Sequence, residues 1–131
     1  MKMSDKTYNK IAVFDVNKVV GQSKRVQDLK TEQETKVREL NMWLAGIKVD
    51  VESRKSEEEK QTLVAEYNKQ FAQRQNEIRD NYTQKLKDIE NEITELISKA
   101  AQEKGYDMVL SKYVVLFGGD DITEEIMATV Q

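Results

Sequence analysis

In the stretch VRELNMWLAGIKVDV, residues 37–51, apolar side chains recur at alternating spacings of three and four positions. The residues with this spacing are Val37, Leu40, Leu44, Ile47 and Val51. Such spacing is typical of the seam of a coiled coil, in which one helix covers its apolar stripe with another helix. The stretch therefore predicts a long helix that needs a partner helix.

The partner helix is predicted in the following part of the chain, where apolar residues recur at helical spacing from Leu63 to Ala100. Residues 53–56, Ser-Arg-Lys-Ser, interrupt the stripe, and Ser56 with Glu59 forms an S-x-x-E capping box that favours a new helix start. Gly105 can end that helix, since a residue without Cβ adopts the left-handed conformation at low cost. We therefore expect an antiparallel helical hairpin over residues 24–104, with its tip near 53–56.

The chain ends carry apolar runs that predict a small β-sheet. Residues 11–14, IAVF, are apolar at both alternating sets of positions, so this strand should be covered on both faces. Residues 106–110 and 113–117 predict an antiparallel hairpin that turns at Ser111 and Lys112, and Gly118-Gly119 should end the sheet.

Two short helices are predicted beside these strands. The first is expected after a cap at Asp15 or Asn17, with Gly21 as a break, and the second after a cap at Asp121 or Thr123. The expected fold class is α+β and mainly α, with residues 1–131 forming a single domain. Its β-sheet body takes residues 10–23 and 105–131, and its long hairpin arm takes residues 24–104.

Composition excludes several classes of function. The 131 residues include no histidine and no cysteine, so the usual general base, thiolate nucleophile and zinc ligands are missing. We therefore expect no enzyme activity, no metal site and no cofactor. Residues 24–104 hold 16 Lys or Arg and 17 Asp or Glu, which leaves no basic stripe for a nucleic acid.

Membrane insertion is not expected either, since the sequence lacks a run of about 18 apolar residues. Residues 1–10 also lack the apolar region of a secretory signal. A signal peptide is therefore expected to be absent from this chain, either removed or never present.

Three motifs in this order around the long hairpin resemble the Skp/OmpH family of periplasmic chaperones. They are IAVFDV at 11–16, EKGYDMVL at 103–110 and DITEEI at 121–126. The resemblance implies a jellyfish-like homotrimer, in which strands from three subunits form the body and the helical arms surround a cavity. It also implies a periplasmic holdase that binds unfolded outer-membrane protein precursors without ATP. A nearly neutral arm departs from the basic arms typical of that family.

Residues of the predicted strands are the candidates for the trimer interface, because the local helices can cover only one face of the sheet. The interface is predicted to include Ile11, Val13, Phe14, Val109, Val114 and Leu116.

Candidates for client binding lie in the outgoing helix. With Leu44 at zero and about 100° per residue, Met42 and Val49 project about 160° and 140° away from the seam, and Trp43 lies on its flank. Met42, Trp43 and Val49 could contact unfolded chains, pack against a neighbouring arm, or be ordinary exposed apolar residues.

The sequence is also compatible with two other functions. One is a structural or tethering coiled coil that binds a specific folded partner. The other is a prefoldin-like jellyfish, which the position of the predicted strands at the chain ends disfavours.

Overall fold

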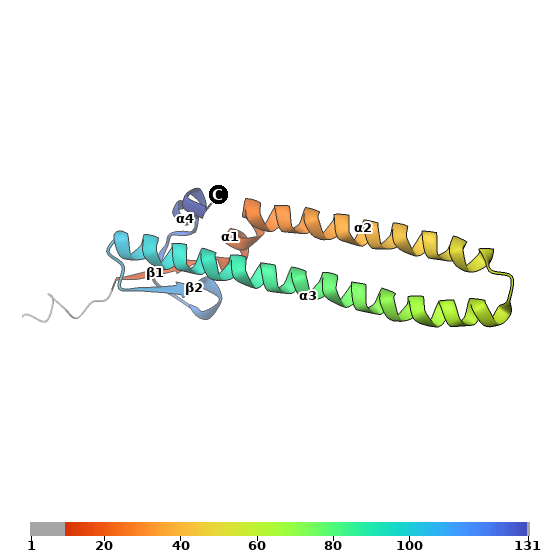
Figure 1. Ribbon diagram of the computed structural model, residues 1–131. Helices are drawn as coiled ribbons and strands as arrows, with labels where there is room; N and C mark the ends of the chain where they lie inside the picture. Colours follow the sequence, from red (N-terminus) through yellow and green to blue (C-terminus); the bar gives the residue numbers. More distant parts are fainter. Residues whose placement is uncertain (1–9, 131) are drawn as a thin grey trace, which may run out of the picture. The chain divides into compact units, whose positions relative to one another are not determined.

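The computed structural model describes residues 10–130, which divide into two compact units. The body unit comprises residues 10–27 and 87–130, and the arm unit comprises residues 28–86. Helix α2, Lys24–Ser53, and helix α3, Glu57–Glu103, each contribute to both units (Figure 1). The fold is mainly helical with a small sheet built from the chain ends, as predicted.

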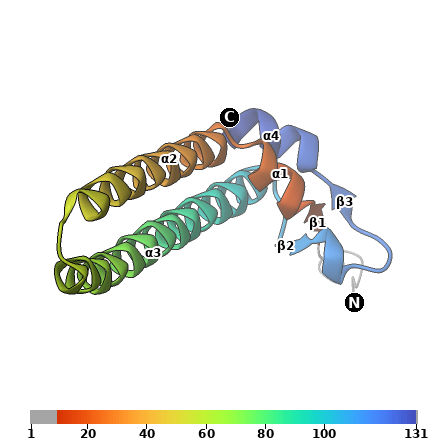
Figure 2. The same cartoon turned by 90° about the vertical axis from the view of Figure 1, so that its right-hand side faces the viewer.

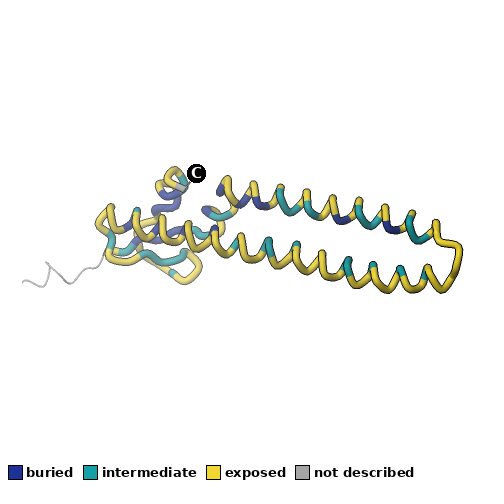
Figure 3. Tube along the Cα trace, in the orientation of Figure 1, coloured by how far each residue is buried: buried dark blue, intermediate teal, exposed yellow. Residues whose placement is uncertain are grey.

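In the arm unit, α2 and α3 run antiparallel and are joined by residues 54–56, where the tip was predicted. The Ser56 hydroxyl accepts a hydrogen bond from the Glu59 backbone N–H at 3.4 Å, so the predicted cap is confirmed. The most buried residues of α2 in this unit are Leu29, Leu40 and Ile47. Figure 3 shows that buried and half-buried positions alternate with exposed ones along this helix.

Helix α3 ends in the body unit with a glycine motif. Gly105 has φ +86°, its N–H donates to the Gln102 carbonyl at 3.0 Å, and the Tyr106 N–H donates to the Ala101 carbonyl at 3.0 Å. This pair of bonds is a Schellman motif, which satisfies carbonyls that the helix end leaves free. The predicted helix end at Gly105 is therefore confirmed.

The body unit contains a three-stranded sheet in the order β2-β1-β3, and all its strands are parallel. The strands are β1, Ile11–Phe14; β2, Met108–Ser111; and β3, Asp120–Asp121. Ile11 pairs with Met108 on one side of β1, and Val13 pairs with Asp121 on the other. The predicted antiparallel hairpin of 106–110 and 113–117 is therefore wrong, and so is the expectation that Gly118-Gly119 ends the sheet.

Two local features explain the difference. The Ser111 hydroxyl accepts the Tyr113 N–H at 3.4 Å and starts a 3₁₀ turn, Lys112–Val114, which ends β2 before a hairpin can form. Gly119, with φ +82°, then brings the chain against β1, where an added Cβ would clash with Cγ2 of Val13. The glycine pair therefore permits a third strand beside β1, and Ile122 N–H donates to the Val13 carbonyl at 2.9 Å.

Helix α1, Val16–Gln22, is capped by Asp15, whose carboxylate accepts the Lys18 N–H at 3.1 Å. Of the two predicted caps, Asp15 is thus confirmed, while Asn17 lies inside the helix. The break expected at Gly21 falls instead at Ser23, because α1 continues to Gln22.

The last helix, α4, Thr123–Val130, packs beside α1 (Figure 2). The core of the body unit is built from α3, α1, α4, the start of α2 and the sheet. Its least exposed apolar residues are Ala12, Val19, Val26, Ile93, Ile97, Ala101, Ile122 and Ile126. Strand β1 is covered on both faces, as its apolar pattern predicted, since Ala12, Val13 and Phe14 are all buried.

Candidate functional site

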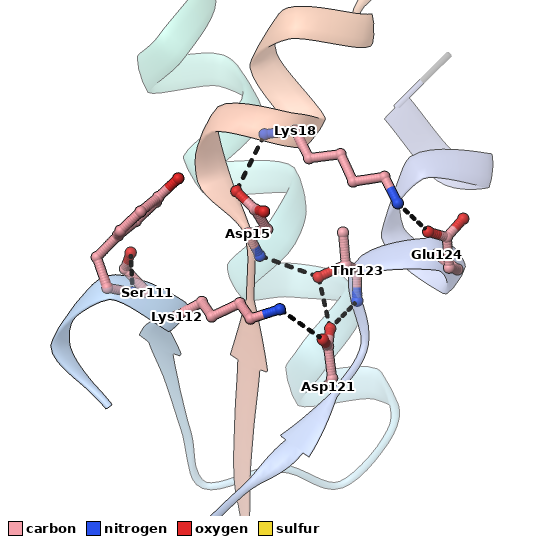
Figure 4. Close-up of polar contacts among 8 residues, drawn as sticks. Asp15, Lys18, Ser111, Lys112, Asp121, Thr123 and Glu124 are labelled. Atoms are coloured by element: carbon pink, nitrogen blue, oxygen red, sulfur yellow. Dashed lines mark hydrogen bonds and ion pairs between the residues drawn. The ribbon is translucent and has the colours of Figure 1, made fainter. Parts of the chain in front are cut away.

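A polar junction joins the carboxyl ends of β1 and β3 to the start of α4 (Figure 4). The Asp15 backbone N–H donates to the Thr123 hydroxyl at 2.9 Å. Thr123 donates through its own N–H and hydroxyl to Oδ1 of Asp121, at 3.0 and 2.5 Å. These two bonds lower the pKa of the Asp121 carboxyl. These hydrogen bonds therefore connect β1, β3 and α4 within the body unit.

Lysine side chains form ion pairs with the carboxylates around this junction. Lys18 donates to Glu124 at 2.6 Å, and this hydrogen bond together with the Glu124 charge raises the pKa of the Lys18 amine. Lys112 lies 4.0 Å from Asp121, and Lys104 lies 3.0 Å from Glu125. Exposed pairs of this kind are typical of a solvated protein surface.

The most exposed large apolar side chains of the body unit lie on the segment 113–117, which begins within the 3₁₀ turn and ends before Gly118. Leu116 and Phe117 are almost fully exposed, at 102% and 94%, and Tyr113 and Val114 are exposed as well. A single exposed apolar residue is ordinary, whereas four exposed large apolar side chains within five residues make this segment a candidate interaction surface. We call residues 113–117 the exposed apolar segment.

The predicted interface residues fall into three groups. Val13 and Phe14 are buried in the core of their own chain, Ile11 and Val109 are half-buried, and Val114 and Leu116 belong to the exposed apolar segment. The sequence-based prediction took Val114 and Leu116 from the run 113–117 and left out the two aromatic residues at its ends, Tyr113 and Phe117. Their aromatic character was the signal that could have identified them.

On one side of the arm unit, Trp43 packs between the two helices. Its ring meets the Tyr67 ring edge-on, with centroids 6.1 Å apart, and the Arg74 guanidinium lies 4.4 Å from its centroid. The Tyr67 hydroxyl donates to Asp50 at 2.9 Å, and this bond raises the pKa of Tyr67. Trp43 is therefore half-buried and largely engaged within the arm.

Met42 and Val49 lie elsewhere, each 68% exposed on α2. They are seven positions apart and so lie on the same face of the helix. Met42 and Val49 therefore share an exposed face of α2, whereas Trp43 packs against α3.

The other side of the arm unit is hollowed. One hollow of about 460 Å³ is lined by Val37, Leu40, Phe71 and Ile78, among others. A second, of about 270 Å³, is lined by Leu44, Ile47, Val51, Val64 and Tyr67 with three polar neighbours. Periodicity alone did not indicate these hollows, because it treats all seam residues as paired.

Comparison with known proteins supplies the family. The model of a family described as Outer membrane protein (OmpH-like) matches residues 10–130. The chain belongs to the OmpH-like family. Members of this family are chaperones and are generally not enzymes.

A solved structure of an OmpH-like protein from Caulobacter crescentus CB15 has the same fold as this OmpH-like chain. The two superpose with a TM-score of 0.68 at 15% sequence identity, covering 94% of this chain and 84% of the other. A search of curated proteins gave no match.

Two structural findings concern other kinds of site in this OmpH-like chain. Within residues 10–130, no three side chains of the metal-binding types gather in a cluster that could hold an ion. Among the described helices, none combines the length and apolar character needed to cross a membrane.

Proposed function

We propose that this chain is a holdase chaperone that binds unfolded polypeptides without ATP, as a homotrimer in the periplasm. The family match over residues 10–130 carries this proposal. By resemblance, the clients are precursors of outer-membrane proteins.

The exposed apolar segment supports the trimer. Burial of apolar surface stabilises an assembly by about 25 cal/mol per Å². This stabilisation is available from the exposed side chains of the segment, which are Tyr113, Val114, Leu116 and Phe117. Copies of the same chain can cover them, together with the half-buried Ile11 and Val109 at the flanking strands. Val13 and Phe14 would then support this interface from the core behind it.

Weak and distributed contacts suit the arm. Met42 and Val49 offer exposed apolar surface, each contributing on the order of 1 kcal/mol when covered, and Trp43 supports the same helix from its other side. Three arms acting together would convert such contacts into useful affinity. Because the arm is nearly neutral, retention of a client should change little between 50 and 500 mM salt.

An aggregation assay tests the proposal. The purified chain is mixed with a chemically unfolded outer-membrane β-barrel protein, and light scattering is followed after dilution of the denaturant. We expect suppression at near-stoichiometric amounts and without nucleotide. Scattering equal to that of an inert protein would reject a holdase and favour the tethering coiled coil.

A matched pair of variants tests the client surface. Met42→Gln with Val49→Gln should weaken retention severalfold while leaving helix content unchanged, because both side chains are exposed. Gln73→Ala with Asn76→Ala, at exposed positions of α3, is the control and should retain clients like the parent chain.

A further inference from the structure

The two sides of the arm unit differ in chemistry. With Leu44 at zero and about 100° per residue, Lys36, Glu39 and Trp43 project to negative angles, whereas Val37 and Asn41 project to about +20° and +60°. The negative side carries the Trp43, Arg74 and Tyr67 contacts and a hollow of only about 200 Å³ with four charged lining residues. We call it the charged side.

The positive side carries the hollows of about 460 and 270 Å³, which are lined by successive parts of α2. We call them together the open groove. Its floor is apolar and is provided by both helices: Val37, Leu40, Val51, Val64, Phe71 and Ile78. Val37 and Val64 are each 42% exposed, so this floor is accessible to a partner.

Uncharged amides line the edges of this groove. Gln33, Asn41 and Gln75 line the larger hollow, and Asn68 lines the smaller one. Among residues 10–130, no hydrogen bond joins any of these four amide side chains to the rest of the chain. Each amide offers two N–H donors and one carbonyl acceptor. The charged residues of the groove edge are Lys48, Glu52 and Arg79, and the first two are of opposite sign and four positions apart.

This chemistry complements the main chain of an extended polypeptide. An extended segment presents free backbone N–H and C=O groups, and each amide can bond to either kind. In a helical segment the backbone N–H and C=O groups are already hydrogen-bonded to one another, so they would not bond to the side-chain amides of the groove. A nearly neutral edge also favours an uncharged segment, since it gives no long-range attraction to a charged one.

The length of the groove sets the length of its occupant. The lining residues of the two successive hollows run from Gln33 to Glu52 along α2, which is about 28 Å at 1.5 Å per residue. An extended chain rises about 3.3 Å per residue, so about nine residues fill the groove. Alternating apolar and polar residues would place one apolar row on the floor and the polar row toward solvent.

We infer that the open groove of each arm binds one extended segment of an unfolded client, about nine residues long, with alternating apolar and polar side chains. This inference rests on the proposed holdase function and identifies the conformation that the arm selects. Amides at the edge hold the main chain, and the apolar floor takes every second side chain.

Two labelled peptides of identical composition test the inference on the full chain. One alternates apolar and polar residues, and the other has the same residues rearranged to a helical period. Fluorescence anisotropy should show the alternating peptide bound about fivefold or more tightly, the effect of one or two hydrogen bonds.

Variants assign this preference to the groove. Asn68→Ala with Gln75→Ala should bring the two affinities close to equality, whereas the control Gln73→Ala with Asn76→Ala should preserve the preference. Val37→Gln with Val64→Gln should weaken both peptides, and circular dichroism will confirm that its helices remain.

Three outcomes would overturn the inference. Tighter binding of the helical-period peptide would assign the groove to an amphipathic helix. If the two double amide variants changed the peptide preference equally, the groove would not be the site that recognises the peptide. If the chain suppresses aggregation yet binds neither peptide, the holdase function stands and the groove inference fails; if it binds the alternating peptide but does not suppress aggregation, the groove stands and the holdase function fails.

Discussion

Ser23, between α1 and α2, has a buried hydroxyl that makes no hydrogen bond within the described residues. A buried polar group without a partner costs free energy, so its removal should be neutral or favourable. We expect Ser23→Ala to change the free energy of unfolding by between zero and about +1 kcal/mol. Ser56→Ala is the matched comparison, because it removes the cap of α3 and should destabilise by about 1 kcal/mol. Urea unfolding of both variants measures the difference, and a Ser23→Ala loss as large as that of Ser56→Ala would contradict the expectation.

Asp121 gives the body unit a defined response to acid. Hydrogen bonds from Thr123 lower its pKa below the ordinary value of 3.8, so the folded state favours the ionised carboxylate. The resulting stabilisation is present above about pH 4 and is lost as the pH falls through the lowered pKa. Asp121→Asn should therefore lower the free energy of unfolding at pH 7, and the gap from the parent chain should narrow at pH 3. A gap that is constant between these pH values would show that the carboxylate is not held in this way.

At the scale of elements, alanine substitutions at two glycines distinguish the effect of a turn conformation from the effect of helix propensity. Gly119→Ala should destabilise by about 1–3 kcal/mol, because φ is +82° and the new Cβ would meet the Val13 side chain. Gly46→Ala should instead stabilise by about 0.5–1 kcal/mol, since Gly46 lies inside α2 with no neighbour within 4 Å of an added Cβ. Thermal unfolding of the two variants should shift in opposite directions. A shared direction would contradict the role of Gly119 in placing β3.

The elements also show which parts of the structure a sequence can specify. The hairpin was predictable because helical periodicity and the Ser56 and Gly105 signals are local. The parallel sheet was not predictable, because β3 consists of Asp120-Asp121, which has no strand propensity. Its pairing partner β1 also lies far away in the sequence. The run 113–117 has strand propensity, but it begins within a 3₁₀ turn and most of its side chains are exposed. At the candidate site, Met42 and Val49 were correctly predicted to point away from the seam, whereas the groove depends on how two helices meet.

At the scale of the whole molecule, the apolar surface left by one chain indicates where another should bind. Leu116 and Phe117 bury almost none of their apolar surface within their own chain. Val13 is buried beneath Gly119 instead. A charge at 116 and 117 should therefore weaken association, whereas a charge at 13 should unfold the chain itself.

Leu116→Asp with Phe117→Asp tests this distinction. Light scattering coupled to size exclusion should give about three times 15.2 kDa for the parent chain and a mass near 15.2 kDa for the double variant, with helix content retained. Val13→Asp should instead lose cooperative unfolding, because an unpaired charge in the core costs several kcal/mol. The reason for the contrast is that only exposed side chains can be changed without disturbing the fold of one subunit. A parent chain that stays monomeric at all concentrations would rule out the trimer, and a double variant that stays trimeric would move its interface away from the exposed apolar segment.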